Sequence, residues 1–224
     1  MSAHLPQIQA VLFDLDGTLL DSAPDLGFAA NQLRAVRAMA PLPQSDYRPF
    51  VGTGARGMLR IALGVTPEDE SFEALKEEFF QAYENCMGQH SSLFNGVVQL
   101  LEALNRSGLP WGIVTNKSER FTLPIVKQLL EFATAKAVVC GDTTPYSKPH
   151  PEPLYEAARR LKVLPESCIY VGDDERDILA AHAAGMQSVA AAYGYLGKAG
   201  TVEAWQAHAI INCPLELTQV LGLN

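Results

Sequence analysis

The sequence predicts an α/β fold, a doubly wound parallel sheet that carries an all-helical insert after its first strand. Three observations support this prediction. A short apolar run near the N-terminus ends in two aspartates, Asp14 and Asp16. Residues 22–93 then show helical spacing of apolar residues and no strand-like run. From there to the C-terminus, helical and strand-like segments alternate, which is the pattern of βαβ units and a parallel sheet.

The length and charge of the chain limit its class. Its 224 residues suffice for one large domain with a smaller insert, and 48% of them are hydrophobic. The net charge of −8 argues against general nucleic-acid binding and against attachment to an anionic membrane. No run approaches the roughly 18 apolar residues of a membrane span, and no cysteine spacing suggests zinc. We therefore expect a cytoplasmic protein, monomeric or homodimeric, that acts on a small molecule.

The helical insert is expected to span residues 22–93, and the α/β core residues 1–21 and 94–224. Within the insert, "APDLGFAANQLRAVRAM" and "GARGMLRIALG" show helical periodicity. A longer helix is predicted from Thr66, which suits an N-cap, with Pro67 in its first turn. Arg56 is expected in a loop between two of these helices, because glycines surround it in "VGTGARG".

The strands of the core are expected to be apolar throughout, as is typical of strands that helices cover on both faces. In such a sheet, ligands bind at the carboxyl ends of the strands. The strands after the first are expected in "PWGIVTN", "KAVVCGD", "SCIYVGDD", "MQSVAAAYG" and "AHAIINCP".

Polar and charged residues follow four of the expected strands. Asp14 and Asp16 point to the same side of the first strand, so either a positive group is expected between them or one of them is expected to hold a proton. The other strand ends carry hydroxyl, amide, amino and carboxyl groups. The full set is Asp14, Asp16, Thr115, Asn116, Lys117, Lys148, Asp173 and Asp174, with Asp177 one helical turn later.

This set of side chains suits phosphoryl transfer. Clustered aspartates bind a hard divalent cation, and Mg²⁺ is the common choice beside a phosphate, whose charge it screens. One carboxylate can attack phosphorus to form an aspartyl-phosphate. A second carboxyl group can protonate the leaving oxygen and later activate water. Lysine, threonine and asparagine can bind the phosphoryl oxygens.

Four segments of the chain resemble the four motifs of the haloacid dehalogenase superfamily, in the same order. The first motif of that superfamily has the form DxDGT, the second ends in threonine, the third carries a lysine and the fourth is acidic. The insert resembles the cap of the phosphoglycolate phosphatase-type members. The matching segments are "FDLDGTLLDS", "IVTN", "SKPHPEP" and "YVGDDERDI".

The resemblance implies a role for each matching residue. Asp14 would be the nucleophile and a Mg²⁺ ligand, and Asp16 the general acid/base, with its backbone carbonyl also on the metal. Asp173 would be the other protein ligand. Asp177 would hold a metal-bound water or orient the lysine, and Asp174 would lie beside the metal ligands. The residues implied to bind phosphate are Thr115, Asn116 and Lys148.

Other activities remain as alternatives to hydrolysis. A dehalogenase needs neither a second aspartate nor Mg²⁺, so Asp16 argues against it. The similar β-phosphoglucomutases carry a histidine in the first hinge, where this chain has "LLDSAPDLGFA", so a mutase is the alternative to a hydrolase. A receiver-like signalling domain has its nucleophile in mid-chain and no cap. A catalytically silent binding protein would be expected to lose a motif, and none is lost here.

Two substrates are compatible with the resemblance, besides another small sugar phosphate. The general type suggests 2-phosphoglycolate. The segments "WGIVTNKSERFTLPIV", "GTGAR", "HSSLFNG" and "YGYL" also resemble the N-acetylmuramic acid 6-phosphate phosphatases. Both substrates carry a carboxylate in addition to the phosphate. Arg56 is the candidate to bind this carboxylate, because a guanidinium group matches a carboxylate in a bidentate manner.

Overall fold

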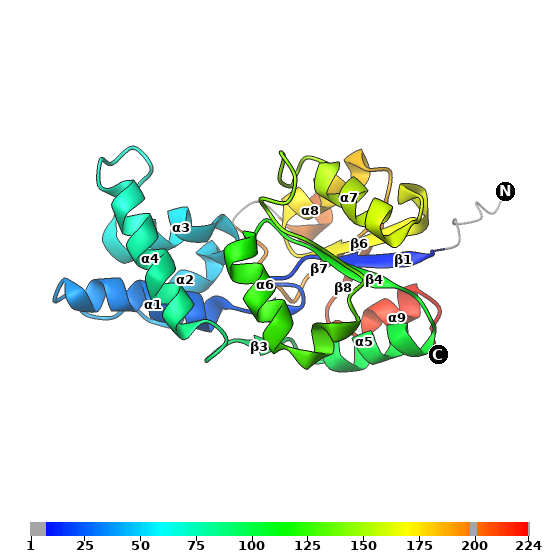
Figure 1. Ribbon diagram of the computed structural model, residues 1–224, viewed down its shortest axis with the longest axis horizontal. Coiled ribbons are helices and arrows are strands. Elements are labelled where there is room, and N and C mark those ends of the chain that lie inside the picture. The colour runs from blue at the N-terminus through cyan, green and yellow to red at the C-terminus, as the bar shows by residue number, and fades with distance from the viewer. Residues whose placement is uncertain (1–7, 198–200, 224) are drawn as a thin grey trace. The chain divides into compact units, whose positions relative to one another are not determined.

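The computed structural model describes residues 8–197 and 201–223, which form two units (Figure 1). The smaller unit is Leu20–Ser92, and the residues before and after it form the larger, core unit. The insert was expected at 22–93. Within the described part of the chain, no helix has the length and the apolar character needed to cross a membrane.

The core unit contains a six-stranded sheet with the strand order β5-β4-β1-β6-β7-β8. Every neighbouring pair is parallel, which confirms the predicted parallel sheet. The strands are β1 (Ala10–Phe13), β4 (Trp111–Val114), β5 (Ala137–Val139), β6 (Cys168–Gly172), β7 (Gln187–Ala191) and β8 (Ala209–Ile211).

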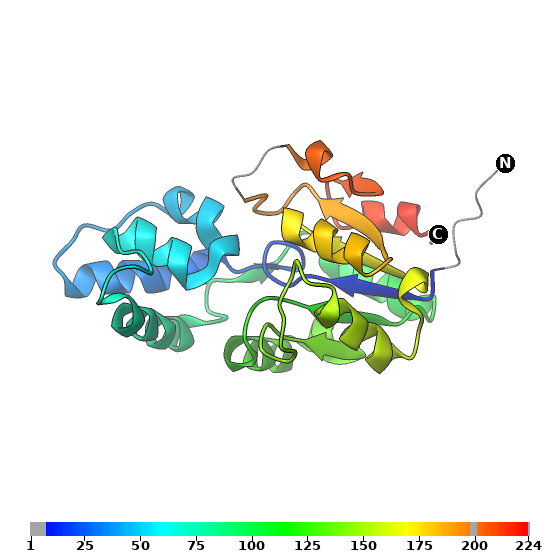
Figure 2. The same ribbon diagram turned by 90° about the horizontal axis from the view of Figure 1, so that it is seen from above.

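Strand β1 lies at the point where the chain changes direction across the sheet. Its neighbours are β4, with Val11 opposite Trp111, and β6, with Val11 opposite Ile169. The chain runs outward from β1 through β4 to β5, and then returns to β6 on the other side. Figure 2 shows β1 passing through the core to the loop that follows it. This reversal makes the carboxyl end of β1 a switch point, where parallel sheets bind their ligands.

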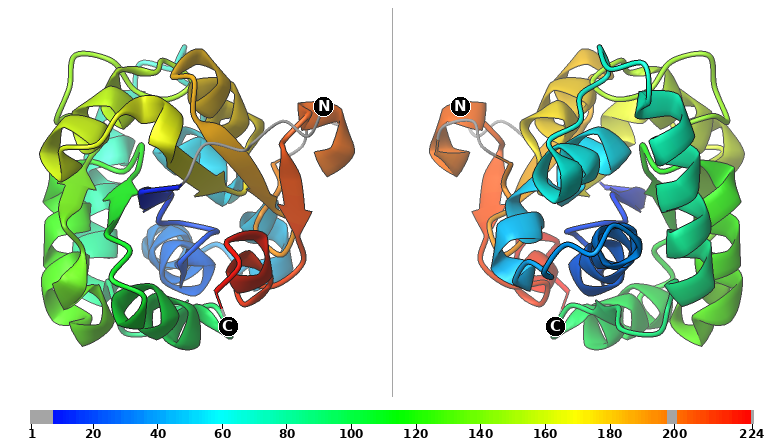
Figure 3. Two further views of the ribbon diagram at one scale, coloured as in Figure 1. Left: turned by 90° about the vertical axis from the view of Figure 1, so that its right-hand side faces the viewer. Right: turned by 90° about the vertical axis from the view of Figure 1, so that its left-hand side faces the viewer.

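Helices cover both faces of the sheet, which explains why the strands are apolar throughout. Helices α7 (Glu152–Leu161) and α8 (Glu175–Ala183) lie on one face (Figure 3). Their alanines pack against buried strand residues, including Leu12 and Tyr170. The other elements of the core are α5 (Val97–Arg106) and α9 (Glu216–Val220) on the opposite face, α6 (Glu119–Gln128), η2 (Leu130–Thr134), η3 (Pro165–Ser167) and η4 (Val202–Trp205).

The smaller unit is helical, as predicted. Its long helix does not begin at Thr66, and that part of the prediction is wrong. The Asp69 carboxylate accepts hydrogen bonds from the Thr66 backbone N–H at 2.7 Å and from its hydroxyl at 3.1 Å, which closes a separate turn. The elements are α1 (Ala23–Val36), α2 (Gln44–Tyr47), η1 (Arg48–Thr53), α3 (Gly54–Leu63) and α4 (Phe72–Cys86).

The helix predicted over "GARGMLRIALG" is present as α3, and the expected loop around Arg56 is absent. Arg56 lies in the first turn of α3, and the two residues before Gly54 belong to the 3₁₀ helix η1. The chain turns between these two helices at Gly54, whose φ of +62° is a conformation that favours glycine. A sharp turn at one glycine therefore replaces the loop.

Two short strands, β2 (Leu20–Asp21) and β3 (Ser92–Leu93), pair where the chain leaves the core and returns to it. Next to them, the Phe94 N–H donates to the Leu19 carbonyl at 3.1 Å. Within the helical unit, the buried Asp25 carboxylate accepts hydrogen bonds from the N–H groups of Gly88 (2.7 Å) and His90 (2.8 Å). The start of α1 is therefore tied to the segment that leads back to the core.

Candidate active site

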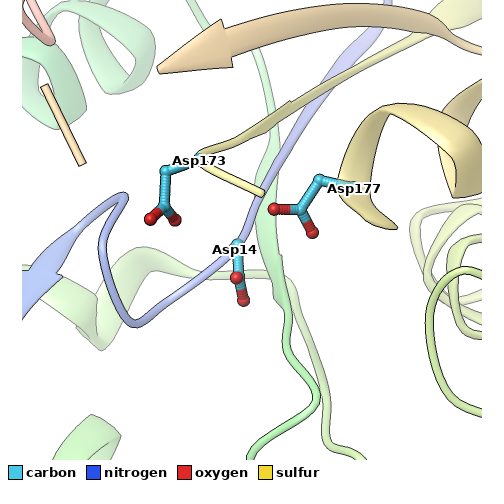
Figure 4. Close-up of side chains that lie close together, drawn as sticks. All are labelled: Asp14, Asp173 and Asp177. Atoms are coloured by element: carbon cyan, nitrogen blue, oxygen red, sulfur yellow. The ribbon is translucent and has the colours of Figure 1, made fainter. Parts of the chain in front are cut away.

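Three carboxylates meet at the carboxyl ends of β1 and β6 (Figure 4). Asp14 follows β1, Asp173 follows β6, and Asp177 lies in the first turn of α8. One oxygen atom from each side chain lies within 4.8 Å of the other two. Asp173 and Asp177 are buried, and Asp14 is partly buried. The structure thus brings together three of the aspartates that the sequence placed at strand ends.

Lys148 contributes a positive charge to this cluster. Its Nζ lies 3.0 Å from Asp14 Oδ1 and 2.7 Å from Asp177 Oδ1, and its side chain is only 2% exposed. It also donates to the Val114 carbonyl at 3.0 Å and to the Tyr170 hydroxyl oxygen at 2.7 Å. The ammonium group is therefore held between the proposed nucleophile and a helix carboxylate by four oxygen atoms.

Asp173 is fixed by the turn that follows the first motif. Its carboxylate accepts hydrogen bonds from the Thr18 hydroxyl at 3.0 Å and from the Tyr195 N–H at 2.8 Å. Gly17 has a φ of +87°, and a Cβ atom there would lie 2.1 Å from Asp173 Oδ2. A Cβ atom on Gly194 would lie 2.2 Å from the Asp173 Cβ atom. The backbone approaches Asp173 so closely that only glycine fits at either position.

The site holds more negative charge than its lysine neutralises. Burial raises the pKa of Asp14 to about 6, an effect that Lys148 opposes and that Asp177 and Asp16 increase. Burial, together with Asp14 and Asp177, raises the pKa of Asp173 well above its ordinary value. Burial alone would lower the pKa of Lys148, but Asp14 and Asp177 raise it, so the amine stays protonated. A buried set of oxygen donors with excess negative charge suits a hard divalent cation.

The raised pKa of Asp14 predicts how stability depends on pH without metal. The native state binds the Asp14 proton more tightly than the unfolded chain does, whose pKa is near 3.8. Stability should therefore fall as pH rises from about 4 to about 6, by at most about 3 kcal/mol from this group. We expect Asp14→Asn to remove this part of the pH dependence. Urea unfolding of both proteins in chelator between pH 4 and 7 measures it, and parallel curves would contradict it.

Asp174 and Asp177 form a capping box at the start of α8. The Asp174 carboxylate accepts the Arg176 N–H at 2.9 Å, and Asp177 Oδ2 accepts the Asp174 N–H at 3.1 Å. Arg176 also binds both Asp174 oxygens, at 2.7 and 2.9 Å, and lowers the pKa of Asp174 although burial acts in the opposite direction. Asp177 thus caps the helix with one oxygen atom and orients Lys148 with the other.

Thr115 and Asn116 directly follow β4. The buried Thr115 hydroxyl accepts the Lys117 N–H at 3.2 Å. The Asn116 side-chain amide donates to the Lys148 carbonyl and accepts the Lys148 N–H, both at 2.9 Å. Asn116 therefore holds the lysine loop against the end of β4, and its contact with phosphate stays a prediction.

Three residues at the site were not assigned a site contact from the sequence. Lys117 Nζ lies 3.1 Å from both oxygens of Asp16, the second aspartate of the first motif. A lysine therefore lies beside each aspartate of the first motif, Lys148 beside Asp14 and Lys117 beside Asp16. The Tyr170 hydroxyl oxygen accepts a hydrogen bond from Lys148. The Thr18 hydroxyl donates one to Asp173. Thr18 stands inside the first motif, while nothing in its apolar strand marks Tyr170.

Arg56 belongs to the helical unit, where it is exposed. Other arginines of this unit are engaged: Arg37 with Glu78, and Arg48 with Asp21. Within the described ranges of the chain, Arg56 makes no hydrogen bond or ion pair. Its guanidinium group is therefore available to a ligand.

The chain is 44% identical over 209 residues to a phosphoglycolate phosphatase of Xanthomonas campestris pv. campestris, covering 93% of this chain and 94% of that protein. It is 39% identical over 215 residues to an N-acetylmuramic acid 6-phosphate phosphatase of Pseudomonas putida, covering 96% of each. A crystal structure of a predicted phosphoglycolate phosphatase from Haemophilus somnus superposes with a TM-score of 0.85 at 26% identity, covering 96% of this chain and 99% of that one.

The sequence profile of the haloacid dehalogenase-like hydrolases matches residues 11–191, a range that includes every core site residue expected from the sequence. The order of the motifs, the parallel sheet and the cluster of acids at its carboxyl edge agree with this match. The chain belongs to the haloacid dehalogenase-like hydrolase family.

Proposed function

We propose that the protein is a Mg²⁺-dependent phosphomonoester hydrolase that works through an aspartyl-phosphate on a small carboxylated phosphate metabolite. The observation that carries this proposal is the placement of Lys148 between Asp14 and Asp177 at the carboxyl end of β1. A carboxylate beside a buried ammonium group is oriented for attack on phosphorus, and the ammonium group can also bind the phosphoryl oxygens. Family membership supports the same chemistry.

The donor set fits Mg²⁺. The Asp14 and Asp173 carboxylates and the Asp16 backbone carbonyl would hold the ion, with Asp177 close by through a water molecule. When bound, Mg²⁺ screens the charge of the phosphate dianion from these acids. Thr18, Tyr195 and the two glycines beside Asp173 keep that carboxylate in place.

In the two proposed half-reactions, Asp14 carries the phosphoryl group and Asp16 carries the proton. In the first, an Asp14 oxygen bonds to phosphorus, the bond to the leaving oxygen breaks, and Asp16 gives that oxygen a proton. In the second, a water oxygen bonds to phosphorus, its proton passes to Asp16, and the bond to Asp14 breaks. Inorganic phosphate leaves and both side chains return to their starting forms. Thr115 and Lys148 bind the phosphoryl oxygens throughout.

The names of two relatives suggest two candidate substrates. These are phosphoglycolate and N-acetylmuramic acid 6-phosphate. We test the proposal with phosphorylated metabolites that include both, together with β-glucose 1-phosphate for the mutase alternative. Phosphate release should require Mg²⁺ and stop with a chelator. Ca²⁺ should inhibit, because its longer and looser coordination does not hold the nucleophile in line. Turnover that survives exhaustive chelation would overturn the proposal.

Arg56 is proposed to bind the substrate carboxylate. Loss of a desolvated, charge-assisted pair costs roughly 1.5–3 kcal/mol, which is about ten- to more than a hundredfold in kcat/KM. Arg56→Ala should lose this much toward the true substrate and little toward p-nitrophenyl phosphate, which has no carboxylate. Arg37→Ala, which removes an exposed pair with Glu78, is the matched control. Equal losses on both substrates would mean that Arg56 supports the helical unit instead.

A further inference from the structure

The ion pair between Lys117 and Asp16 is the feature of the site that the proposed chemistry does not yet use. Lys117 Nζ lies 3.1 Å from both Asp16 oxygens, and the two side chains are 8% and 17% exposed. Removing two charges from water costs free energy, so a partly buried pair of this kind contributes little net stability. Because the pair lies beside the proposed nucleophile Asp14, a role in the reaction accounts for it better than a role in stability.

The backbone of Lys117 is fixed before any substrate arrives. Its N–H donates to the Thr115 hydroxyl at 3.2 Å, and its carbonyl accepts the Gly141 N–H at 2.8 Å and the Thr122 hydroxyl at 3.2 Å. Gly141 lies so close to this segment that a Cβ atom there would be 2.2 Å from the Asn116 carbonyl oxygen. The end of β4 and the loop after β5 thus hold the lysine in one place.

Asp16 lies just beyond the end of the neighbouring strand β1. Strand β1 pairs with β4 in register, with Phe13 opposite Ile113, so the residues after each strand emerge side by side. A symmetric contact with both carboxylate oxygens restricts rotation of the Asp16 side chain. A group that moves a proton must be held within hydrogen-bond reach of the reacting oxygen atom.

We propose that Lys117 is the positioning residue for Asp16, holding its carboxyl group where it gives a proton to the leaving oxygen and takes one from water. This inference rests on the proposed function. It gives Lys117 a task distinct from that of Lys148, which contacts Asp14 and Asp177. Lys117 acts through Asp16 and needs no contact with the substrate.

The test uses leaving groups that differ in their need for a proton. p-Nitrophenolate departs as a stable anion, whereas phenolate departs more readily when protonated. Lys117→Met should lower kcat/KM by about ten- to a hundredfold for phenyl phosphate and by less than about threefold for p-nitrophenyl phosphate. Asp16→Asn should show the same selective loss, and the double variant should lose little more than Asp16→Asn alone. Lys117→Arg should recover part of the activity, and Lys127→Met, which alters an exposed lysine of α6, should match the wild type.

Three results would overturn the inference. Equal losses on both substrates with a raised KM would make Lys117 a phosphate-binding residue. Equal losses with a lowered melting temperature in both Lys117 variants would make the pair structural. A gain or no change on phenyl phosphate would mean that Lys117 restrains Asp16 or does not affect it. If the wild type with Mg²⁺ releases phosphate from none of the phosphorylated metabolites and from neither aryl phosphate, the proposed function itself fails, and the inference fails with it.

Discussion

Asp14→Asn is expected to abolish turnover, with a loss of at least about 10⁴-fold in kcat. The asparagine amide has the same shape but cannot form the acyl-phosphate bond that the proposed mechanism requires. Its oxygen atom can still accept the Leu15 N–H, which donates to Asp14 Oδ1 at 2.7 Å, so the loop should keep its conformation. The loss would therefore reflect chemistry and not folding.

Two measurements check this expectation. Steady-state phosphate release compares Asp14→Asn with Asp46→Asn, a control at an exposed aspartate of the helical unit. Mass spectrometry or crystallography after treatment with beryllofluoride and Mg²⁺ should find the adduct on Asp14 in the wild type and on no residue of the variant. Substantial turnover by Asp14→Asn, or an adduct on another aspartate, would remove the aspartyl-phosphate mechanism.

Lys148→Met is expected to lower the free energy of unfolding by about 3–5 kcal/mol in metal-free buffer at pH 8. The substitution leaves Asp14 and Asp177 facing each other without the ammonium group that now lies between them. It also removes the donor to the Tyr170 hydroxyl oxygen. At pH 5 the deficit should be smaller, because the Asp14 carboxyl group can then bind a proton and lose its charge.

A second substitution distinguishes the loss of the Lys148 charge from the loss of its side-chain packing. Asp177→Asn in the Lys148→Met background removes one of the opposed charges, so the double variant should recover part of the lost stability. Lys127→Met serves as the control for replacing a lysine on an exposed surface. Urea denaturation of the wild type and these three variants at pH 5 and pH 8 in chelator gives the free energies of unfolding. A deficit that is equal at both pH values, with no recovery in the double variant, would indicate lost packing.

The fold class and the acidic cluster could be predicted because each depends on short-range patterns. Apolar strands that alternate with helices predict a parallel sheet, and polar residues at strand ends then meet at one edge. The pairing of Lys117 with Asp16 could not be predicted in this way. These residues are 101 positions apart in the sequence, and their contact depends on β4 lying beside β1 in a particular register.

The errors in the helical unit concern where its helices begin. Thr66 and Pro67 form a good helix start, and the Asp69 carboxylate accepts the Thr66 N–H as in a capping box, but this segment makes only a turn before α4 begins at Phe72. The glycines near Arg56 suggested a loop, whereas one of them makes the turn between two helices. The partners of Asn116 were likewise hidden, because its amide binds the backbone of Lys148, 32 positions away.

The paired strands β2 and β3 have a consequence for how the enzyme can diversify. The chain leaves the core after Leu19 and returns before Phe94, and one hydrogen bond of 3.1 Å joins these two residues. An insertion between adjacent backbone positions alters no strand register, and the entropy of closing it grows only with the logarithm of its length. The helical unit can therefore change in sequence and length during evolution without altering the core sheet. Such changes can adapt the protein to a metabolite of another size while the residues of the reaction centre stay the same.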